Sequence, residues 1–184
     1  MVMPWPAIDP IPSHRLLLDP LTMSAAEEMV SVLEDPELYE YTGGRAPTLE
    51  QLRTQYATQV AGRSEDGAQW WLNWVVRWRH SKEPAGYVQA TVEDNHGTRV
   101  AEIAWVVSVA HQRQGVATEA SGAVIEWLRS FGVQLVVAHI HPYHIASAVV
   151  ARRLRLHRTD KWDDGEIRWE RTLDSGPPAH GSSQ

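Results

Sequence analysis

The chain has 184 residues, of which 43% are hydrophobic, and it carries a formal net charge of −6 at pH 7. That length suits one folded domain, and the acidic balance argues against a nucleic-acid-binding protein, which normally presents a basic face. Because the sequence has no cysteine, no apolar run long enough for a membrane span and no signal-peptide pattern, we expect a cytoplasmic protein without disulfides, thiolate metal sites or membrane contact.

The two ends of the chain have compositions typical of extended, loosely packed segments. Residues 1–14 carry four prolines and predict an extended arm, and residues 174–184 predict a flexible tail. One domain is therefore expected over residues 15–173. At its start, the segment "HRLLLDPL" predicts a short strand that ends at Pro20.

Two helices are predicted next, each with a capping pattern at its start. Ser24 and Glu27 have the spacing of a capping box, and apolar residues follow at helical intervals up to Leu33. Thr48 and Gln51 repeat this spacing ahead of a second apolar stripe. We therefore expect one helix to begin after Ser24 and another after Thr48.

The following segment predicts a meander of strands. Apolar and polar residues alternate over residues 71–79 and again over 86–93, and an apolar run covers residues 100–109. The links between these segments are short, and the second link has the composition of a turn. Antiparallel pairing of neighbouring strands is the expected result.

The C-terminal half of the chain alternates helices and strands. One helical stripe stops at Gly132, the apolar run at residues 133–140 predicts a strand covered on both faces, and a further helix follows Pro142. The strands at 100–109 and 133–140 should lie parallel, because a helix connects them, and an Asp-Gly turn predicts a final hairpin. The expected fold class is α/β (α+β), a single domain with a mixed, mostly antiparallel central sheet flanked by helices.

The segment "HQRQGVATEA", residues 111–120, joins the apolar strand to the first of these helices. Such a turn gathers free backbone N–H groups at a helix N-terminus, which is a favourable place for an anion. Gly115 allows a close approach of the backbone to a ligand, Ala117 is small, and Thr118 can cap the helix. The spacing matches neither a Walker loop nor a dinucleotide-binding fingerprint. A glycine that merely closes the turn would explain the same residues.

Together with the segment "HPYHIASAVVARRLRLHRTD", this turn resembles the GNAT acetyltransferase superfamily, whose coenzyme A signature is Gln/Arg-x-x-Gly-x-Gly/Ala after a strand. The signature positions in this chain are Gln112, Gly115 and Ala117. Residues 112–120 also match the pattern Gln-x-x-Gly-x-Ala-Thr-Glu-Ala of the Rim-type branch, which is named for ribosomal-protein N-terminal acetylation. The resemblance implies a GNAT fold over residues 15–173.

The resemblance also implies acetyl-CoA as the co-substrate and no metal. It places the pantetheine arm along the end of the strand, at Val107, Ser108 and Val109. It places the pyrophosphate on the backbone amides of the turn, at Arg113, Gln114, Gly115, Val116, Ala117 and Thr118.

Acetyl transfer to an amine needs a base for the amine and a proton for the leaving thiolate. Glu102 resembles, by its place on the strand, the general base of histone-acetylating members of the family. It shares a face with Ala104, Val106 and Ser108, which predicts partial desolvation of its carboxylate. An exposed or ion-paired carboxylate on the rim is the alternative interpretation.

Ser147 is the proton donor that the resemblance to Rim-type members implies. His144 stands where the family often has Asn, near the pantetheine, and Ala151 stands where many members have a tyrosine general acid. Because that tyrosine is absent, Ser147 is the available donor. A hydroxyl that only bonds the helix backbone is the alternative.

Three histidines, His139, His141 and His144, follow one another closely and could be taken for metal ligands. In the fold that the resemblance implies, however, this strand end borders the thioester. Hydrogen-bonding or acceptor-site roles are therefore expected for the imidazoles.

The acceptor is expected to be a primary amine, bound by the early helices and the Trp-rich strand with Trp74 and either Glu40 or Tyr41. The leading hypothesis is an acetyl-CoA-dependent N-acetyltransferase that acts on a peptide N-terminus or a small cationic amine. The alternative is a catalytically weak acyl-CoA-binding module that serves as a sensor or interaction protein. Edge strands and exposed tryptophans are compatible with a homodimer.

Overall fold

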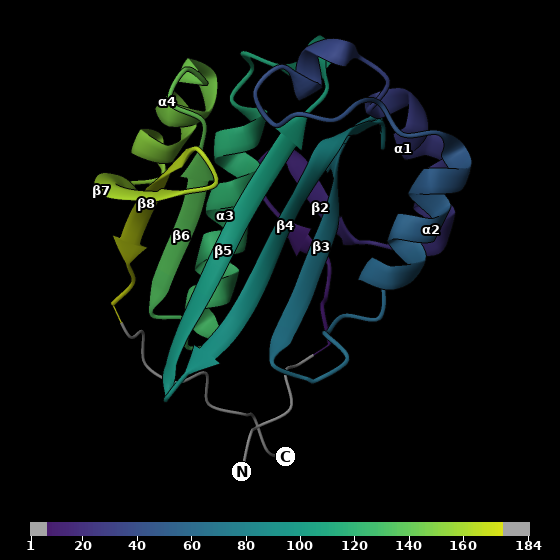
Figure 1. Cartoon of the computed structure of the whole chain (residues 1–184). Coiled ribbons are helices and arrows are strands. Elements are labelled where there is room, and N and C mark those ends of the chain that lie inside the picture. The colour runs from purple at the N-terminus through teal and green to yellow at the C-terminus, as the bar shows by residue number, and fades with distance from the viewer. Residues whose placement is uncertain (1–6, 175–184) are drawn as a thin grey trace.

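The computed structural model describes residues 7–174, and its centre is an eight-stranded sheet in the order β1-β2-β3-β4-β5-β6-β8-β7 (Figure 1). The strands are β1 Ile11–Pro12, β2 Leu16–Pro20, β3 Gln69–Trp78, β4 Pro84–Asn95, β5 Thr98–Val107, β6 Leu135–Ile140, β7 His157–Asp163 and β8 Glu166–Thr172. The α-helices are α1 Ala26–Val32, α2 Leu49–Gln59, α3 Val116–Ser130 and α4 Ile145–Arg153, and short 3-10 helices are η1 Met23–Ala25, η2 Pro36–Tyr39 and η3 Val109–His111.

The sheet is mixed, as the sequence predicted. Neighbours from β1 to β5 pair antiparallel, and so do β6, β8 and β7. The exception is β5 with β6, which pair in parallel and are connected by α3. The meander, the parallel crossover pair and the final hairpin are therefore confirmed, and so is the expected class of a mixed, mostly antiparallel sheet flanked by helices.

Helices cover both faces of the sheet (Figure 1). One face packs against α3 and α4, and this main core contains Trp74, Ile103 and Val136 from the strands with Leu128 and Ala151 from the helices. The opposite face carries a smaller core formed with α1 and α2. Strand β6 is covered on both faces, because its consecutive residues Val136, Val137 and Ala138 are all buried, as the apolar run predicted, whereas β4 and β5 bury alternate residues.

The two predicted capping boxes have different outcomes. Thr48 accepts a hydrogen bond from the Gln51 amide, and the Gln51 side chain accepts one from the Thr48 amide, so the second box is present. The first is wrong: Ser24 lies inside η1, and no side chain caps η1 or α1. The chain enters α1 through a turn of 3-10 helix, which satisfies the first amides through backbone bonds instead.

The predicted N-terminal arm is described from residue 7 onwards. Ile11 and Pro12 form β1, which pairs with β2 at the sheet edge, and Ile11 is buried in the main core. Part of the arm thus packs against the domain. Of the predicted C-terminal tail, residues 175–184 lie outside the described residues. Among residues 7–174, none of the helices has both the length and the apolar character needed to cross a bilayer.

Candidate active site

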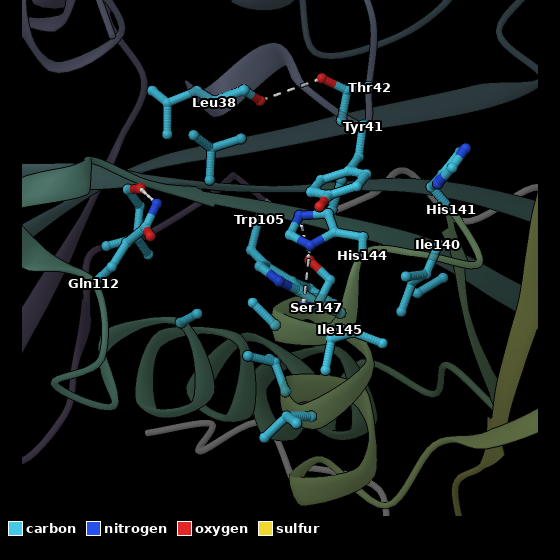
Figure 2. A pocket seen from close by; sticks show the side chains of 18 of the residues that line it. Leu38, Tyr41, Thr42, Trp105, Gln112, Ile140, His141, His144, Ile145 and Ser147 are labelled. Atoms are coloured by element: carbon cyan, nitrogen blue, oxygen red, sulfur yellow. Dashed lines mark hydrogen bonds between the residues drawn. The ribbon is translucent and has the colours of Figure 1, made fainter. Parts of the chain in front are cut away.

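A fork between β5 and β6 opens the middle of the sheet. The two strands are paired in register from Val100 to Glu102 on β5. Beyond Glu102, β5 continues to Val107 beside β4, while β6 continues to Ile140 beside β8. A cavity of about 820 Å³ occupies this fork, lined by β4, β5 and β6, the turn before α3, α4 as far as Arg153 and the segments 37–38 and 40–42 (Figure 2).

Most of the predicted cofactor-binding residues meet in this cavity. Those that line it are Val107, Gln112, Arg113, Gly115, Val116, Ala117, Thr118, His144 and Ser147. Ser108, Val109 and Gln114 are not among its lining residues. The fork therefore gathers residues that are up to 40 positions apart in the sequence.

The turn before α3 has an unusual backbone. Arg113 and Gly115 both have positive φ, of 60° and 78°. Among the described residues, the amides of 113–118 have no hydrogen-bond acceptor, and the first backbone bond of the helix runs from the Glu119 amide to the Gly115 carbonyl. We call residues 113–118 the amide cradle. Six free N–H groups at the N-terminus of a 15-residue helix form a site for an anion.

The structure corrects one detail of this turn. Thr118 does not cap α3, because Gly115 occupies the N-cap position and no side chain bonds there. Thr118 lies within the first helical turn instead. The free amides are therefore not consumed by a side-chain cap.

The three strand residues expected beside the pantetheine differ in their backbone bonding. The Ser108 amide donates to the Ala85 carbonyl at 2.9 Å, so it is used within the sheet, and Val109 has already entered η3. Val107 lies at the fork, where its carbonyl accepts a bond from Gln112 Nε2 at 3.1 Å. The Gln112 side chain thus ties the turn to the end of β5.

His144 and Ser147 form a hydrogen-bonded pair at the start of α4 (Figure 2). His144 is the N-cap, and its Nδ1 accepts from the Ser147 amide at 3.5 Å, while its Nε2 lies 3.1 Å from Ser147 Oγ. Since Nδ1 accepts, the neutral tautomer carries its hydrogen on Nε2 and donates to Ser147 Oγ. The Ser147 hydroxyl hydrogen is then free to point into the cavity. The Tyr41 ring stacks on His144 at 4.7 Å between centroids.

The pKa of His144 is lowered from 6.5 because burial disfavours the charged ring; repulsion from His141 adds to this, and attraction from Glu40 opposes it. Protonation would place a hydrogen on Nδ1 and remove the cap. A depressed native pKa means that this stability is present above about 6.5 and is lost as the pH falls through the native value.

We therefore expect acidification from about pH 7.5 to about pH 5 to lower the melting temperature of the wild type more than that of His144→Asn. Asn keeps a capping side chain but does not titrate, and a cap contributes about 1 kcal/mol, or roughly 2–4 °C here. Thermal melts across this range measure the difference. Parallel curves for the two proteins would contradict the role assigned to His144.

The structure places Glu102 on the inner strand β5, at the last pair before the fork, opposite Val137 of β6. The expected partial desolvation is not found, since its side chain is 55% exposed and does not line the cavity. Glu102 Oε1 instead contacts His139 Nδ1 at 2.8 Å, and His139 does line the cavity. Because a carboxylate only accepts, His139 donates from Nδ1, which leaves Nε2 as a proton acceptor. Glu102 thus reaches the cavity through His139.

Three carboxylates also line the cavity: Glu37, Glu40 and Glu166. No ion pair is found for any of them among the described residues. Burial raises the pKa of Glu166; Glu102 and Asp164 add to this, and His139 and His141 oppose it.

Sequence reasoning missed Glu37 and Glu166, and it misplaced Trp74. Glu166 begins β8 just after the predicted Asp-Gly turn, so the hairpin pattern was the one signal that could have placed it at the end of β6. Trp74 is fully buried against Trp127 in the main core and does not line the cavity. Trp105 lines it instead, and of the other acceptor-pocket residues both Glu40 and Tyr41 are present. Within the described part of the chain, no group of three or more acidic or histidine side chains could hold a metal ion.

A family model for the acetyltransferase (GNAT) domain matches residues 15–157. The chain belongs to the GNAT acetyltransferase family. Members of this family are acetyl-CoA-dependent acetyltransferases. A search of curated protein sequences finds no match to this GNAT chain.

Solved structures resemble this GNAT domain over most of its length. RimL, a ribosomal-protein alpha-N-acetyltransferase in complex with coenzyme A, has a TM-score of 0.75 and 16% identity, over 91% of this chain and 99% of that chain. An acetyltransferase from Thermus thermophilus has a TM-score of 0.70 and 18% identity, over 88% and 99%. The microcin self-immunity acetyltransferase MccE, in complex with acetyl-CoA and AMP, has a TM-score of 0.69 and 13% identity, over 86% and 93%. At these identities the likeness shows the fold.

Proposed function

We propose that the protein is an acetyl-CoA-dependent N-acetyltransferase that acts on a primary amine, either a peptide N-terminus or a small cationic amine. The observation that carries this proposal is the amide cradle, which opens into the same cavity as His139, His144 and Ser147. The cradle suits the pyrophosphate of acetyl-CoA, and the backbone edge of β5 in the fork suits the amide groups of the pantetheine. Acetyl-CoA would supply the activated thioester.

In the proposed reaction, the amine nitrogen bonds the acetyl carbon, the carbon–sulfur bond breaks, one proton leaves the amine and one reaches the sulfur. His139 accepts the amine proton at Nε2, directly or through water, and Glu102 holds its tautomer. Ser147 donates the proton for the sulfur, and His144 orients its hydroxyl. These roles retain Glu102 and Ser147 in the mechanism but move the direct contact with the amine to His139.

The charges around the cavity favour a cationic acceptor. Glu37, Glu40 and Glu166 line it without ion-pair partners among the described residues, whereas the two arginines that line it lie elsewhere, Arg113 in the cradle and Arg153 at the end of α4. Carboxylates in a partly enclosed space attract an ammonium group and raise its local concentration. Glu40 lies close enough to affect the pKa of both Tyr41 and His144. We therefore place the acceptor amine near the Tyr41 and His144 rings.

Turnover of a panel of primary amines with acetyl-CoA tests this function, and Glu40→Gln tests the acceptor site. The variant should raise KM for amines that carry a second positive charge about tenfold, and should change KM for amines with a single amino group less, because it removes one attractive carboxylate. Glu50→Gln, an exposed carboxylate on α2, is the matched control.

The outcomes separate the candidate functions. Equal KM values in Glu40→Gln and the wild type would remove the acceptor assignment. Tight binding of acetyl-CoA without turnover of any amine would favour the second candidate, a catalytically weak acyl-CoA-binding module, which the absence of a tyrosine at Ala151 also favours.

A further inference from the structure

The segment that leads into β2 is bonded to the first helical turn of α3 through Glu119. Glu119 Oε1 accepts from Ser13 Oγ at 2.7 Å and from the Arg15 amide at 2.7 Å. Glu119 Oε2 accepts from Arg15 Nε at 2.8 Å. These residues are more than 100 positions apart in the sequence, and three short bonds to one carboxylate make an unusually complete connection.

Arg15 also holds the cradle itself. Its Nη2 donates to the Gln114 carbonyl at 2.9 Å, at the residue between the two positive-φ residues Arg113 and Gly115. A Cβ at Gly115 would lie 3.4 Å from the same nitrogen. The guanidinium rests on the Trp78 ring, 5.6 Å from its centroid. The Arg15 side chain therefore bonds both the turn, at the Gln114 carbonyl, and the helix, at Glu119.

Trp78 extends this connection to the other end of the turn. Its Nε1 donates to His111 Nδ1 at 3.2 Å, and His111 ends η3 immediately before Gln112. The turn is thus held at its start through Trp78 and at its end through Glu119, and Arg15 contacts both. Gly115 supplies the conformation, but these contacts limit which way the amides face.

The pairing of Arg15 with Glu119 also has an electrostatic effect on anion binding. A carboxylate in the first turn of α3 would repel an anion held by the same amides. Burial favours the protonated form of Glu119, yet the bonds from Arg15 and Ser13 outweigh it and lower its pKa. The Glu119 carboxylate stays ionised, and the positive charge of Arg15 neutralises it next to the cradle.

We infer that Arg15 is a positioning residue for phosphate recognition: through Glu119 and the Gln114 carbonyl, it holds the amide cradle in its anion-binding conformation. The inference rests on the proposed function, because it takes the phosphates of CoA as the anion. It goes further than the proposed function by assigning a role in cofactor affinity to Arg15, which lies outside the signature turn, immediately before β2.

The test compares acetyl-CoA with S-acetylpantetheine, which has the same acetylated pantetheine arm but no phosphates. In Arg15→Gln we expect the Kd of acetyl-CoA to rise about tenfold, since the variant loses charge-assisted bonds and leaves the Glu119 charge unpaired. The Kd of S-acetylpantetheine should not change, and kcat at saturating acetyl-CoA should stay close to that of the wild type. Arg15→Lys, which keeps a cation but not the fork of bonds, should recover part of the affinity.

A second measurement does not depend on CoA. Trypsin should cut the Arg113–Gln114 bond faster in Arg15→Gln than in the wild type, because the turn is released. Arg53→Gln is the matched control, since Arg53 makes a similar ion pair with Glu27 away from the turn. Melting temperatures show that each variant is folded.

Each outcome bears on a different claim. Equal weakening of acetyl-CoA and S-acetylpantetheine binding, or unchanged acetyl-CoA binding with unchanged cleavage at Arg113, would overturn the positioning role. A wild type that binds no CoA would overturn the proposed function, and the cleavage rate would still decide whether Arg15 holds the turn.

Discussion

Gly115→Glu should abolish measurable binding of acetyl-CoA. Gly115 has a φ of 78°, a backbone conformation that L residues adopt at a cost of about 1–2 kcal/mol. The new side chain would begin 3.4 Å from Arg15 Nη2 and would bring a negative charge to the cradle. Together these effects should weaken binding at least about 100-fold, and should remove the melting-temperature increase that acetyl-CoA gives the wild type.

Gly97→Glu separates this effect from simple backbone strain. Gly97, at the β4–β5 turn, also has a positive φ, of 91°, and a Cβ added there would have no neighbouring atom within 4 Å. This variant should melt at a slightly lower temperature and still gain stability from acetyl-CoA as the wild type does. If Gly115→Glu were also stabilised by acetyl-CoA, the cradle would not be the phosphate site.

Among the glycines that the structure describes, Gly86 should be the one at which an added methyl group is most destabilising, as Gly86→Ala would show. A Cβ at Gly86 would lie 2.0 Å from the Val106 carbonyl oxygen and 2.9 Å from Val107 Cα. Both atoms belong to the backbone of β5, so relief requires β4 and β5 to separate at the edge of the fork. We expect a loss of about 3 kcal/mol in the free energy of unfolding, or roughly 6–12 °C in melting temperature.

Gly122→Ala is the matched control for a methyl group added to a glycine. At Gly122, within α3, the new Cβ would meet Leu154 Cδ2 at 3.7 Å, an ordinary contact. Alanine is a better helix former than glycine by about 0.5–1 kcal/mol, so this variant should be as stable as the wild type or more stable. Similar melting temperatures for the two alanine variants would contradict this prediction, because they would show that β5 moves away from Gly86 without a loss in the free energy of unfolding.

The order of strands and helices could be predicted from the sequence because local patterns decide it. The Thr48–Gln51 box formed because both partners lie within one turn of the chain. Ser24 has the same spacing, but the chain there enters α1 through η1, and the packing of Ala25 and Ala26 in the smaller core decides the geometry. Capping patterns predict helix starts only where tertiary packing leaves the first turn free.

The amide cradle could also be predicted from a local pattern, since its amides belong to consecutive residues. The acceptor end of the cavity could not be predicted in this way. Glu40 follows η2, His139 lies in β6 and Glu166 begins β8, and only the fork between β5 and β6 brings them to one cavity. Trp74 was misassigned because alternation along a strand gives the two faces but does not say which one packs against α3. The predicted desolvation of Glu102 was wrong for the same reason, because its place on one face of β5 did not say how far that face is covered.

The fork also divides the sheet into two mechanical halves. Within the described residues, the sheet joins β1–β5 to β6, β8 and β7 through the register pairs from Val100–Leu135 to Glu102–Val137 and the bond from the Gln134 amide to the Arg99 carbonyl. A ligand bound between β5 and β6 would contact both halves of the sheet and connect them. Hydrogen exchange in β6 and β8 would then slow together with exchange in β5, so that cofactor binding converts two weakly joined sheets into one cooperative unit.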